Sequence, residues 1–349
     1  MITIGVDAHK RMHAAVAIDA QGREIAAWTG ANTPAGWDAL EAWAAQVGAD
    51  RTWGIEGSGQ YGRGLAQQLV RSGEPVVEVN PRLTADTRRR GRQRGKTDRL
   101  DALAVARTVQ REEVALPVVV PLDVTAVLAI TVAEREAALQ EATRLRNQLH
   151  QHLFQLSATD DRAWPSLTTR SGVATLLDYL APGTDPVLTA HAAAVRRLAT
   201  RLEQTLAHVA TLAAEIEALG QPVLAPLCAI RGVSDLTAGV LAAYLGSGHR
   251  FSTDAKLAMY AGVAPLPVGS AGTERQRLNR TGHRQLNAVF HRIALTQARC
   301  HPPAQEYLAR KRAEGKSRPE AVRCLKRYLV RAVFRAWQQC EIPPLPPPP

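Results

Sequence analysis

The chain has 349 residues, of which 46% are hydrophobic, so it is long enough for two or three folded domains. The formal net charge of +11 comes from two stretches. Residues 82–99 carry eight Lys/Arg and two Asp, and residues 270–335 carry sixteen Lys/Arg and four Glu. Such concentrated positive charge favours a polyanionic partner, nucleic acid in particular. The four cysteines show no CxxC pairing, and no apolar run is long enough to cross a bilayer. These features argue against a disulfide scaffold, a zinc site and a membrane protein, and they indicate a reduced cytoplasmic environment without a signal peptide.

The first 80 residues predict three strands followed by alternating helices and strands. The expected elements are strands at 3–7, 13–19 and 24–29, a helix at 34–47, a strand at 52–56, a Gly-rich segment at 57–62 leading into a helix that ends near 72, and a strand at 75–80. This is the order of a ribonuclease-H-like α/β sheet. Half of a sugar-kinase or actin-type ATPase has the same order, so topology alone leaves the function open.

The middle of the chain is predicted to be helical. A helix is expected from 97 or 98 to 111, followed by a linker marked by Pro117 and Pro121. Residues 125–156 and 187–219 then show long amphipathic patterns rich in Ala, Leu, Glu and Arg. Two such helices indicate an antiparallel hairpin or an oligomerising coiled coil, with residues 157–185 capping its end. We expect this arm to serve spacing, dimerisation or RNA contact, and not chemistry.

Four carboxylates have spacings that can bring them together. Asp7 and Glu56 each end a predicted strand, and these strands are neighbours in a ribonuclease-H-like sheet. Asp98 and Asp101 are three residues apart at a helix start and therefore share a face. Clustered carboxylates suit hard divalent cations, and two Mg²⁺ ions can stabilise both oxygens of a phosphoryl transfer. Taken singly, these acids could instead cap a turn, end a strand, or occupy the N-cap and N3 positions of the helix.

The C-terminal third contains a glycine-centred turn and two basic regions. Residues 227–238 read as a helix-hairpin-helix in which the turn at Arg231 and Gly232 presents backbone N–H groups to a phosphate; an ordinary helical hairpin is the alternative. A helical segment is expected within 251–265, and the basic helices from 284 to 335 would follow a nucleic-acid backbone or form a solvated face.

Ser270 is a candidate nucleophile because it lies between glycines and precedes an arginine cluster. Glycine lets a backbone approach closely, and arginine neutralises phosphate oxygens. Rival serines are Ser234, Ser247 and Ser252. The residues expected to contact nucleic acid are Arg88, Arg89, Arg90, Arg92, Arg94, Lys96, Arg231, Gly232, Arg275, Arg277, Arg280 and Arg284.

Taken together, these motifs resemble the insertion-sequence 110 family of transposases, the bridge-RNA-guided recombinases related to the Piv invertases. The resemblance rests on the segments 4–10 (IGVDAHK), 54–56 (GIE), 80–81 (NP), 96–102 (KTDRLDA), 260–265 (YAGVAP) with the serine five residues later, and 282–286 (GHRQL). Two positions depart from the family pattern: Ala271 where a Gly is expected and His283 where Asn is commoner.

The resemblance implies a RuvC-like domain whose DEDD metal site maps onto Asp7, Glu56, Asp98 and Asp101, and a C-terminal transposase domain whose serine maps onto Ser270. It also implies a coiled-coil arm, an element-encoded guide RNA that pairs with element ends and target DNA, and assembly as a homodimer or homotetramer. The corresponding division is 1–120, 121–220, 221–340 and a Pro-rich disordered tail at 341–349.

The function expected from these residues is a nucleoid-associated DNA recombinase in which Ser270, activated by Mg²⁺ at the four acids, forms a covalent phosphoserine intermediate. Two alternatives remain. The same acids could serve a junction-resolving nuclease that uses water, or the chain could be a non-catalytic nucleic-acid-binding protein.

Overall fold

The computed structural model describes residues 1–81, 83–84, 97–112, 116–156, 164–180, 185–247, 250–264, 266–268, 275–277 and 282–345. Its backbone forms two compact units. The first unit is residues 1–123 with 247–252 and 343–349, and the second is 124–246 with 253–342. No helix within the described ranges combines the length and apolar character needed to span a membrane.

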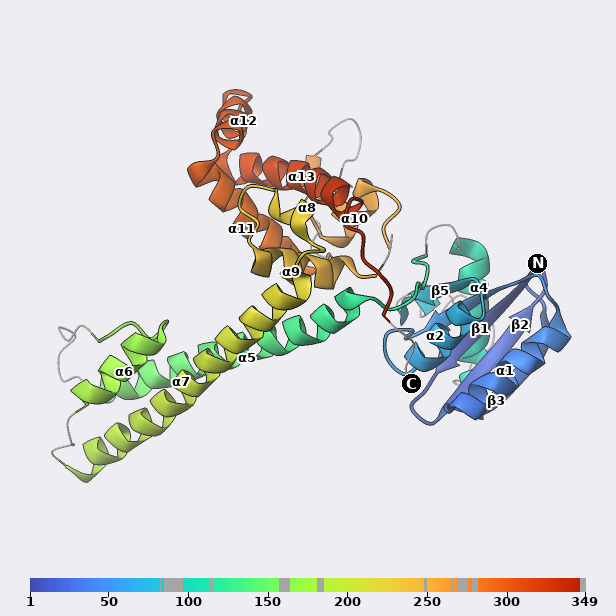
Figure 1. Ribbon diagram of the computed structural model, residues 1–349, viewed down its shortest axis with the longest axis horizontal. Coiled ribbons are helices and arrows are strands. Elements are labelled where there is room, and N and C mark those ends of the chain that lie inside the picture. The colour runs from blue at the N-terminus through green and yellow to red at the C-terminus, as the bar shows by residue number, and fades with distance from the viewer. Residues whose placement is uncertain are drawn as a thin grey trace. The chain divides into compact units, whose positions relative to one another are not determined.

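The first unit contains a five-stranded sheet with the order β3-β2-β1-β4-β5 (Figure 1). The strands are β1 (Ile2–Ala8), β2 (Met12–Ile18), β3 (Glu24–Ala31), β4 (Arg51–Glu56) and β5 (Val76–Val79). The first three form an antiparallel meander, whereas β1, β4 and β5 are parallel. This confirms the ribonuclease-H-like order expected from the sequence.

Helices cover both faces of this sheet because the strands alternate strictly between two apolar faces. Helices α1 (Pro34–Val47) and α2 (Arg63–Arg71) enclose one core with Ile4, Val6 and Trp53. Helix α4 (Asp98–Glu112) packs on the opposite face through Ala102, Leu103, Val105, Ala106 and Val109. Odd-numbered residues of β1 and even-numbered residues of β4 therefore face α4.

Two paired glycines set how closely α4 approaches the sheet. Gly5 and Gly54 are direct partners in the β1–β4 register. A Cβ on Gly5 would lie 2.2 Å from the Ala106 nitrogen, and one on Gly54 would lie 2.2 Å from Val109 Cγ2. The α4 backbone therefore rests directly on β1 at Gly5, while the Val109 side chain fills the space over Gly54 in β4. The first turn of α4 is thereby held close to the ends of both strands.

The second unit begins with an arm of two long antiparallel helices, α5 (Val124–Leu156) and α7 (Pro186–Gly220) (Figure 1). Their direction follows from cross-helix contacts: Glu134 with His208, Glu141 with Arg201, and His152 with His191. The short helix α6 (Arg170–Tyr179) packs at the end of this pair, in a core that includes Leu149, Leu153, Val173 and Val195. The helical hairpin expected from the leucine pattern is thus present, and α6 is its capping element.

The rest of the second unit is mostly helical. Its elements are α8 (Ala225–Cys228), α9 (Asp235–Leu245), α10 (Asp254–Tyr260), β6 (Leu266–Val268), β7 (Arg275–Arg277), α11 (Arg284–Cys300), α12 (Pro302–Ala313) and α13 (Arg318–Trp337). Strands β6 and β7 form a small antiparallel pair that the sequence did not predict. Near the C-terminus, the Leu345 nitrogen donates a hydrogen bond to the Leu122 carbonyl. Pro344 and Asp123 form an isolated antiparallel β-bridge, and all of these residues belong to the first unit. The expected disorder of the tail stays a prediction for 346–349, which lie outside the described residues.

Candidate functional site

Asp7 and Glu56 lie side by side at one edge of the sheet. They are the last paired residues in the parallel β1–β4 register, two positions beyond Gly5 and Gly54. Because side chains alternate along a strand, both carboxylates point to the face covered by α4. Asp7 is 7% exposed, and Glu56 is half-buried. The strand-end geometry predicted from the sequence is therefore present.

The first turn of α4 adds Asp98 and Asp101 to this edge. The Thr97 side chain accepts a hydrogen bond from the Leu100 nitrogen at 3.3 Å, so Thr97 caps the helix. The alternative in which Asp98 is the N-cap is therefore wrong. Asp101 is 4% exposed, whereas the Asp98 side chain is 66% exposed. One acid of the turn is thus buried beside the strands, and the other is open to solvent.

His9 joins the cluster, although the sequence did not single it out. Its Nε2 lies 3.0 Å from Asp7 Oδ2 and 3.5 Å from Asp98 Oδ1. In the described part of the chain, Asp7, His9 and Asp98 are the set of three ligand-type side chains whose atoms lie within 4.8 Å of one another. The available signal was its spacing, because a residue two positions after Asp7 in extended chain returns to the same side.

The burial and the negative charges of this cluster favour the binding of a cation. Burial raises the pKa of Asp7, and the charges of Asp101 and Asp98 raise it further, while the charge and hydrogen bond of His9 lower it. The effects of His9 on this pKa outweigh those of the two acids, so the burial of the carboxylate is the main reason that the pKa is raised. An oxygen-rich, charge-repelling cluster of this kind fits a hard divalent cation such as Mg²⁺.

The turn at Arg231 and Gly232 is held rigidly between α8 and α9. Gly232 has a φ of 89°, which favours glycine. The Gln297 side chain donates to the Arg231 carbonyl at 2.7 Å, and the Ser234 hydroxyl accepts from the Thr237 nitrogen at 3.2 Å. Arg231 itself is exposed. The guanidinium group of Arg231 is therefore exposed to solvent, while the backbone of the turn is held in place by hydrogen bonds.

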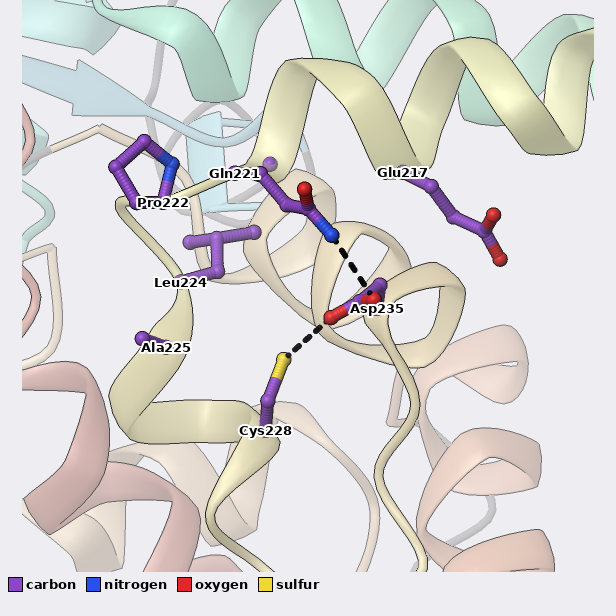
Figure 2. A pocket seen from close by; sticks show the side chains of 8 residues that line it. Glu217, Gln221, Pro222, Leu224, Ala225, Cys228 and Asp235 are labelled. Atoms are coloured by element: carbon purple, nitrogen blue, oxygen red, sulfur yellow. Dashed lines mark hydrogen bonds between the residues drawn. The ribbon is translucent and has the colours of Figure 1, made fainter.

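A cluster of side chains joins the end of α7 to α8 and α9, as Figure 2 shows. The Gln221 amide donates to Asp235 at 3.0 Å, and the Cys228 thiol donates to the same carboxylate at 3.2 Å. Both contacts line a cavity of about 260 Å³. Burial, with smaller effects from Asp235 and Cys340, raises the pKa of Cys228 to about 11. The thiol is therefore protonated at neutral pH.

The predicted nucleophile Ser270 lies outside the described residues, in the connection between β6 and β7. Arg280 and the basic residues Arg88, Arg89, Arg90, Arg92, Arg94 and Lys96 also lie outside them. Arg275 and Arg277 are placed only by their backbone in β7, and Arg284 is exposed at the start of α11. The roles of these residues remain predictions.

The chain on either side of β6 and β7 is closed into a stem. A Cβ on Gly282 would lie 2.2 Å from the Gly262 backbone, and the His283 nitrogen donates to the Tyr260 carbonyl at 2.7 Å. The Asn287 amide donates to the carbonyls of Ala261 and Gly262 at 3.0 and 2.9 Å. Lys326 donates to Asn287 Oδ1 at 2.7 Å.

His283, at the position where the family resemblance predicts Asn, caps helix α11. Its ring Nδ1 accepts a hydrogen bond from the Leu286 nitrogen at 3.2 Å and so caps α11, as an Asn side chain would. The ring also lies between Tyr244 and Tyr260, with centroid distances of 4.7 and 5.4 Å. This departure from the expected family pattern is therefore compatible with the same local structure.

Comparisons with known proteins connect both parts of the chain with one group of enzymes. A family model described as "Transposase" matches residues 4–157, and one described as "Transposase IS116/IS110/IS902 family" matches residues 224–309. The chain is 25% identical over 370 residues to an insertion element IS116 protein of Streptomyces clavuligerus, covering 94% of this chain and 92% of that protein. It is 35% identical over 127 residues to an insertion element IS110 protein of Streptomyces coelicolor, covering 35% of this chain and only 31% of that protein.

Two solved structures of Thermus thermophilus RuvC, one in complex with a Holliday junction substrate, align with 34% of this chain at 12 and 13% identity and a TM-score of 0.27. The fold assignment made above rests on strand order and not on this likeness. From the sequence matches, the chain is therefore similar, in both its N-terminal and its C-terminal part, to insertion-element transposases of the IS116/IS110/IS902 type.

Proposed function

We propose that this chain is a transposase that cuts and rejoins DNA at a metal-dependent carboxylate centre formed by Asp7, Glu56, Asp98 and Asp101. The observation that carries the proposal is the direct pairing of Asp7 with Glu56, under a helix turn that brings two more acids. A bound divalent ion, Mg²⁺ in our proposal and two ions in the full site, would supply positive charge to the oxygens of a phosphodiester.

The residues of the chain have separable roles in this proposal. Asp7 and Glu56 are fixed by the sheet and hold the centre in place. Asp98 and Asp101 complete the oxygen ligands from the helix. His9 orients Asp7 through the 3.0 Å contact between its ring and the carboxylate.

Ser270 is the proposed nucleophile, supported by its position between glycines and before Arg275, Arg277 and Arg280. Its Oγ forms a bond to phosphorus while the bond from phosphorus to the leaving sugar oxygen breaks, and that oxygen takes the proton. The reverse reaction with another sugar hydroxyl rejoins the DNA and frees the serine. Because the phosphodiester energy is stored in the covalent intermediate, rejoining needs no external energy source.

The decisive experiment compares the wild type with Ser270→Ala on labelled DNA carrying the element ends. We expect the variant to bind DNA normally and to form no covalent protein–DNA adduct. The control is Ser252→Ala, which should leave adduct formation unchanged. Persistence of the adduct in Ser270→Ala would show that the serine assignment is wrong.

The two alternatives give different results in the same assay. A junction-resolving nuclease using water would yield cleaved, unligated DNA and would be indifferent to Ser270→Ala. A non-catalytic binding protein would be indifferent to Asp7→Asn and Glu56→Gln as well. Loss of cleavage in both acid variants, with DNA binding retained, supports the carboxylate centre.

We further propose an element-encoded guide RNA and a homodimer or homotetramer as partners, acting on DNA in the cytoplasm at the nucleoid. The arm of α5 and α7 would serve as an oligomerising coiled coil, and the α8–α9 turn as a helix-hairpin-helix phosphate contact. Support for the RNA and the assembly comes from the family resemblance of the motifs. Sequencing of RNA that copurifies with the protein tests the guide, and native mass spectrometry tests the assembly. Absence of any element-derived RNA would contradict the guide.

A further inference from the structure

A basic groove runs beside helix α11 and is not part of the carboxylate centre. It has a volume of about 550 Å³ and is lined by Arg292, Leu295, Thr296, Ala298, Arg299 and Arg318. Residues 292, 295, 296 and 299 follow the i, i+3, i+4, i+7 spacing, so they form one stripe along α11. Arg318 comes from the first turn of α13, which packs against α11.

The charge of this groove is uncompensated among its lining residues. Arg292, Arg299 and Arg318 are exposed, and none of them forms an ion pair with a carboxylate anywhere in the described ranges. Arg327 and Arg331 of α13 differ, because they pair with Asp254 at 2.7 and 3.3 Å. No acidic residue lines the groove. Three cations converging without a counterion are expected to attract an anion.

The position of Arg318 also disfavours a purely structural role. It is the first residue of α13, where the positive end of the helix dipole opposes a cation. The same turn is already capped by the reciprocal contacts of Ser317 and Glu320, so Arg318 is not needed as a cap. An anion in the groove would turn this unfavourable position into a favourable one.

The turn that carries Arg231 packs against the α11 stripe that lines the groove. A Cβ on Gly232 would lie 3.3 Å from Thr296 Cγ2, which places the turn against the stripe. Gln297 fixes the same turn through the Arg231 carbonyl. The backbone of the α8–α9 turn is therefore held against the same stripe of α11 that lines the groove.

We propose that this groove binds the phosphate backbone of duplex DNA, with Arg292, Arg299 and Arg318 each neutralising a phosphate. The inference rests on the proposed function, since DNA is the polyanion on which a transposase acts. Arginine guanidinium groups match the geometry of phosphate oxygens, and contacts to the phosphate backbone position the duplex without carrying sequence information directly. The exposed Leu295 provides an apolar floor between the charges.

The test measures how the affinity for duplex DNA depends on salt. Arg292→Gln, Arg299→Gln and Arg318→Gln are compared singly and together with the wild type, by fluorescence anisotropy in EDTA. Each lost phosphate contact should reduce the slope of log K against log[salt] by about 0.9, and the triple variant by about 2.7. Arg331→Gln is the matched control, because it removes a cation from the same helix outside the groove and should leave the slope nearly unchanged.

An unchanged slope in the triple variant, with its thermal unfolding intact, would overturn the proposal. A reduced slope with RNA but not with DNA would equally overturn it, because the occupant would then be RNA. If the triple variant does not fold, the three single variants decide the matter by the same criterion. Since binding is measured without metal, failure of the carboxylate centre to cleave DNA would leave this result standing, and the reverse also holds.

Discussion

Replacement of Asp7 by Asn should stabilise the metal-free protein while destroying its response to metal. Asp7 is 7% exposed, and its carboxylate lies beside those of Asp98 and Asp101. Asn keeps the shape of the side chain but carries no charge. The substitution therefore removes repulsion and desolvation from a fold that holds these acids together without a cation.

The magnitude follows from the geometry of the cluster. Ligand atoms of Asp7 and Asp98 lie within 4.8 Å of each other. Two unit charges at that separation repel by about 3 kcal/mol at an effective dielectric constant of about 20 and by about 1 kcal/mol in water. Asp98 is exposed and His9 offsets the repulsion, so the gain comes mainly from relieving the desolvation of a buried carboxylate, and we expect it to be about 1 kcal/mol. That gain corresponds to an increase in Tm of about 2–4 °C.

The pH dependence has a definite sign. The folded-state pKa of Asp7 is raised above its ordinary value of 3.8, so the folded protein holds this proton more tightly than the unfolded chain does. The destabilisation is absent below the ordinary pKa and grows as the pH rises through the folded-state pKa. The Tm difference between Asp7→Asn and the wild type should therefore be present at pH 7 and vanish near pH 3.

The assay is differential scanning calorimetry with EDTA and with saturating Mg²⁺ or Mn²⁺. Metal at 100 times its Kd should stabilise the wild type by about 2.7 kcal/mol and leave Asp7→Asn nearly unaffected. Asp19→Asn is the control, because Asp19 binds Arg23 in a turn away from the cluster and should retain the full metal response. A lower Tm for Asp7→Asn in EDTA, or an undiminished metal response, would refute the reasoning.

Further predictions concern the packing of α4 on the sheet, the buried amino group of Lys326 and the reactivity of the cysteine thiols. Gly5→Ala places a Cβ 2.2 Å from the α4 backbone and should cost about 1–3 kcal/mol and weaken Mg²⁺ binding, measured by calorimetry. Asn287→Ala removes the acceptor of Lys326 and should cost about 1–3 kcal/mol in urea unfolding. Burial lowers the pKa of Lys326 below 10.5, so wild-type stability should rise with pH between that lowered pKa and 10.5, and Lys326→Met should lose this rise. At pH 8 iodoacetamide should label exposed Cys300 well before Cys228, whose pKa is about 11; equal rates would contradict the buried thiol.

Much of the first unit could be predicted because its signals are local. Strand ends, the Pro34 helix start and the Asp98–Asp101 spacing each depend on a few adjacent residues, and α1 was predicted with its observed bounds, Pro34–Val47. What could not be predicted was how closely α4 lies on the sheet. That distance depends on Gly5 meeting Gly54 across two strands, and no local pattern reports such a pairing.

The second unit was harder to predict for the same physical reason. Strands β6 and β7 have three residues each, too few for an alternating pattern to be recognised. Similarly, the basic composition of residues 284–335 could not separate Arg292, which faces the groove, from Arg331, which pairs with Asp254. The packing of α13 against α11 and against α10, which carries Asp254, makes that distinction.

Because Gly262 and Gly282 close the stem, the segment between them can change in length and sequence without moving the helices on either side. Asn287 and Lys326 hold the two ends of the segment together. Their hydrogen bonds offset the entropy that the chain loses when these ends come into contact, and both residues lie outside the segment. Doubling the length of a closed connection costs only about 0.6 kcal/mol. Insertions or replacements between β6 and β7 should therefore leave helices α10 and α11 in place, so this part of the chain can diverge independently of the helices around it.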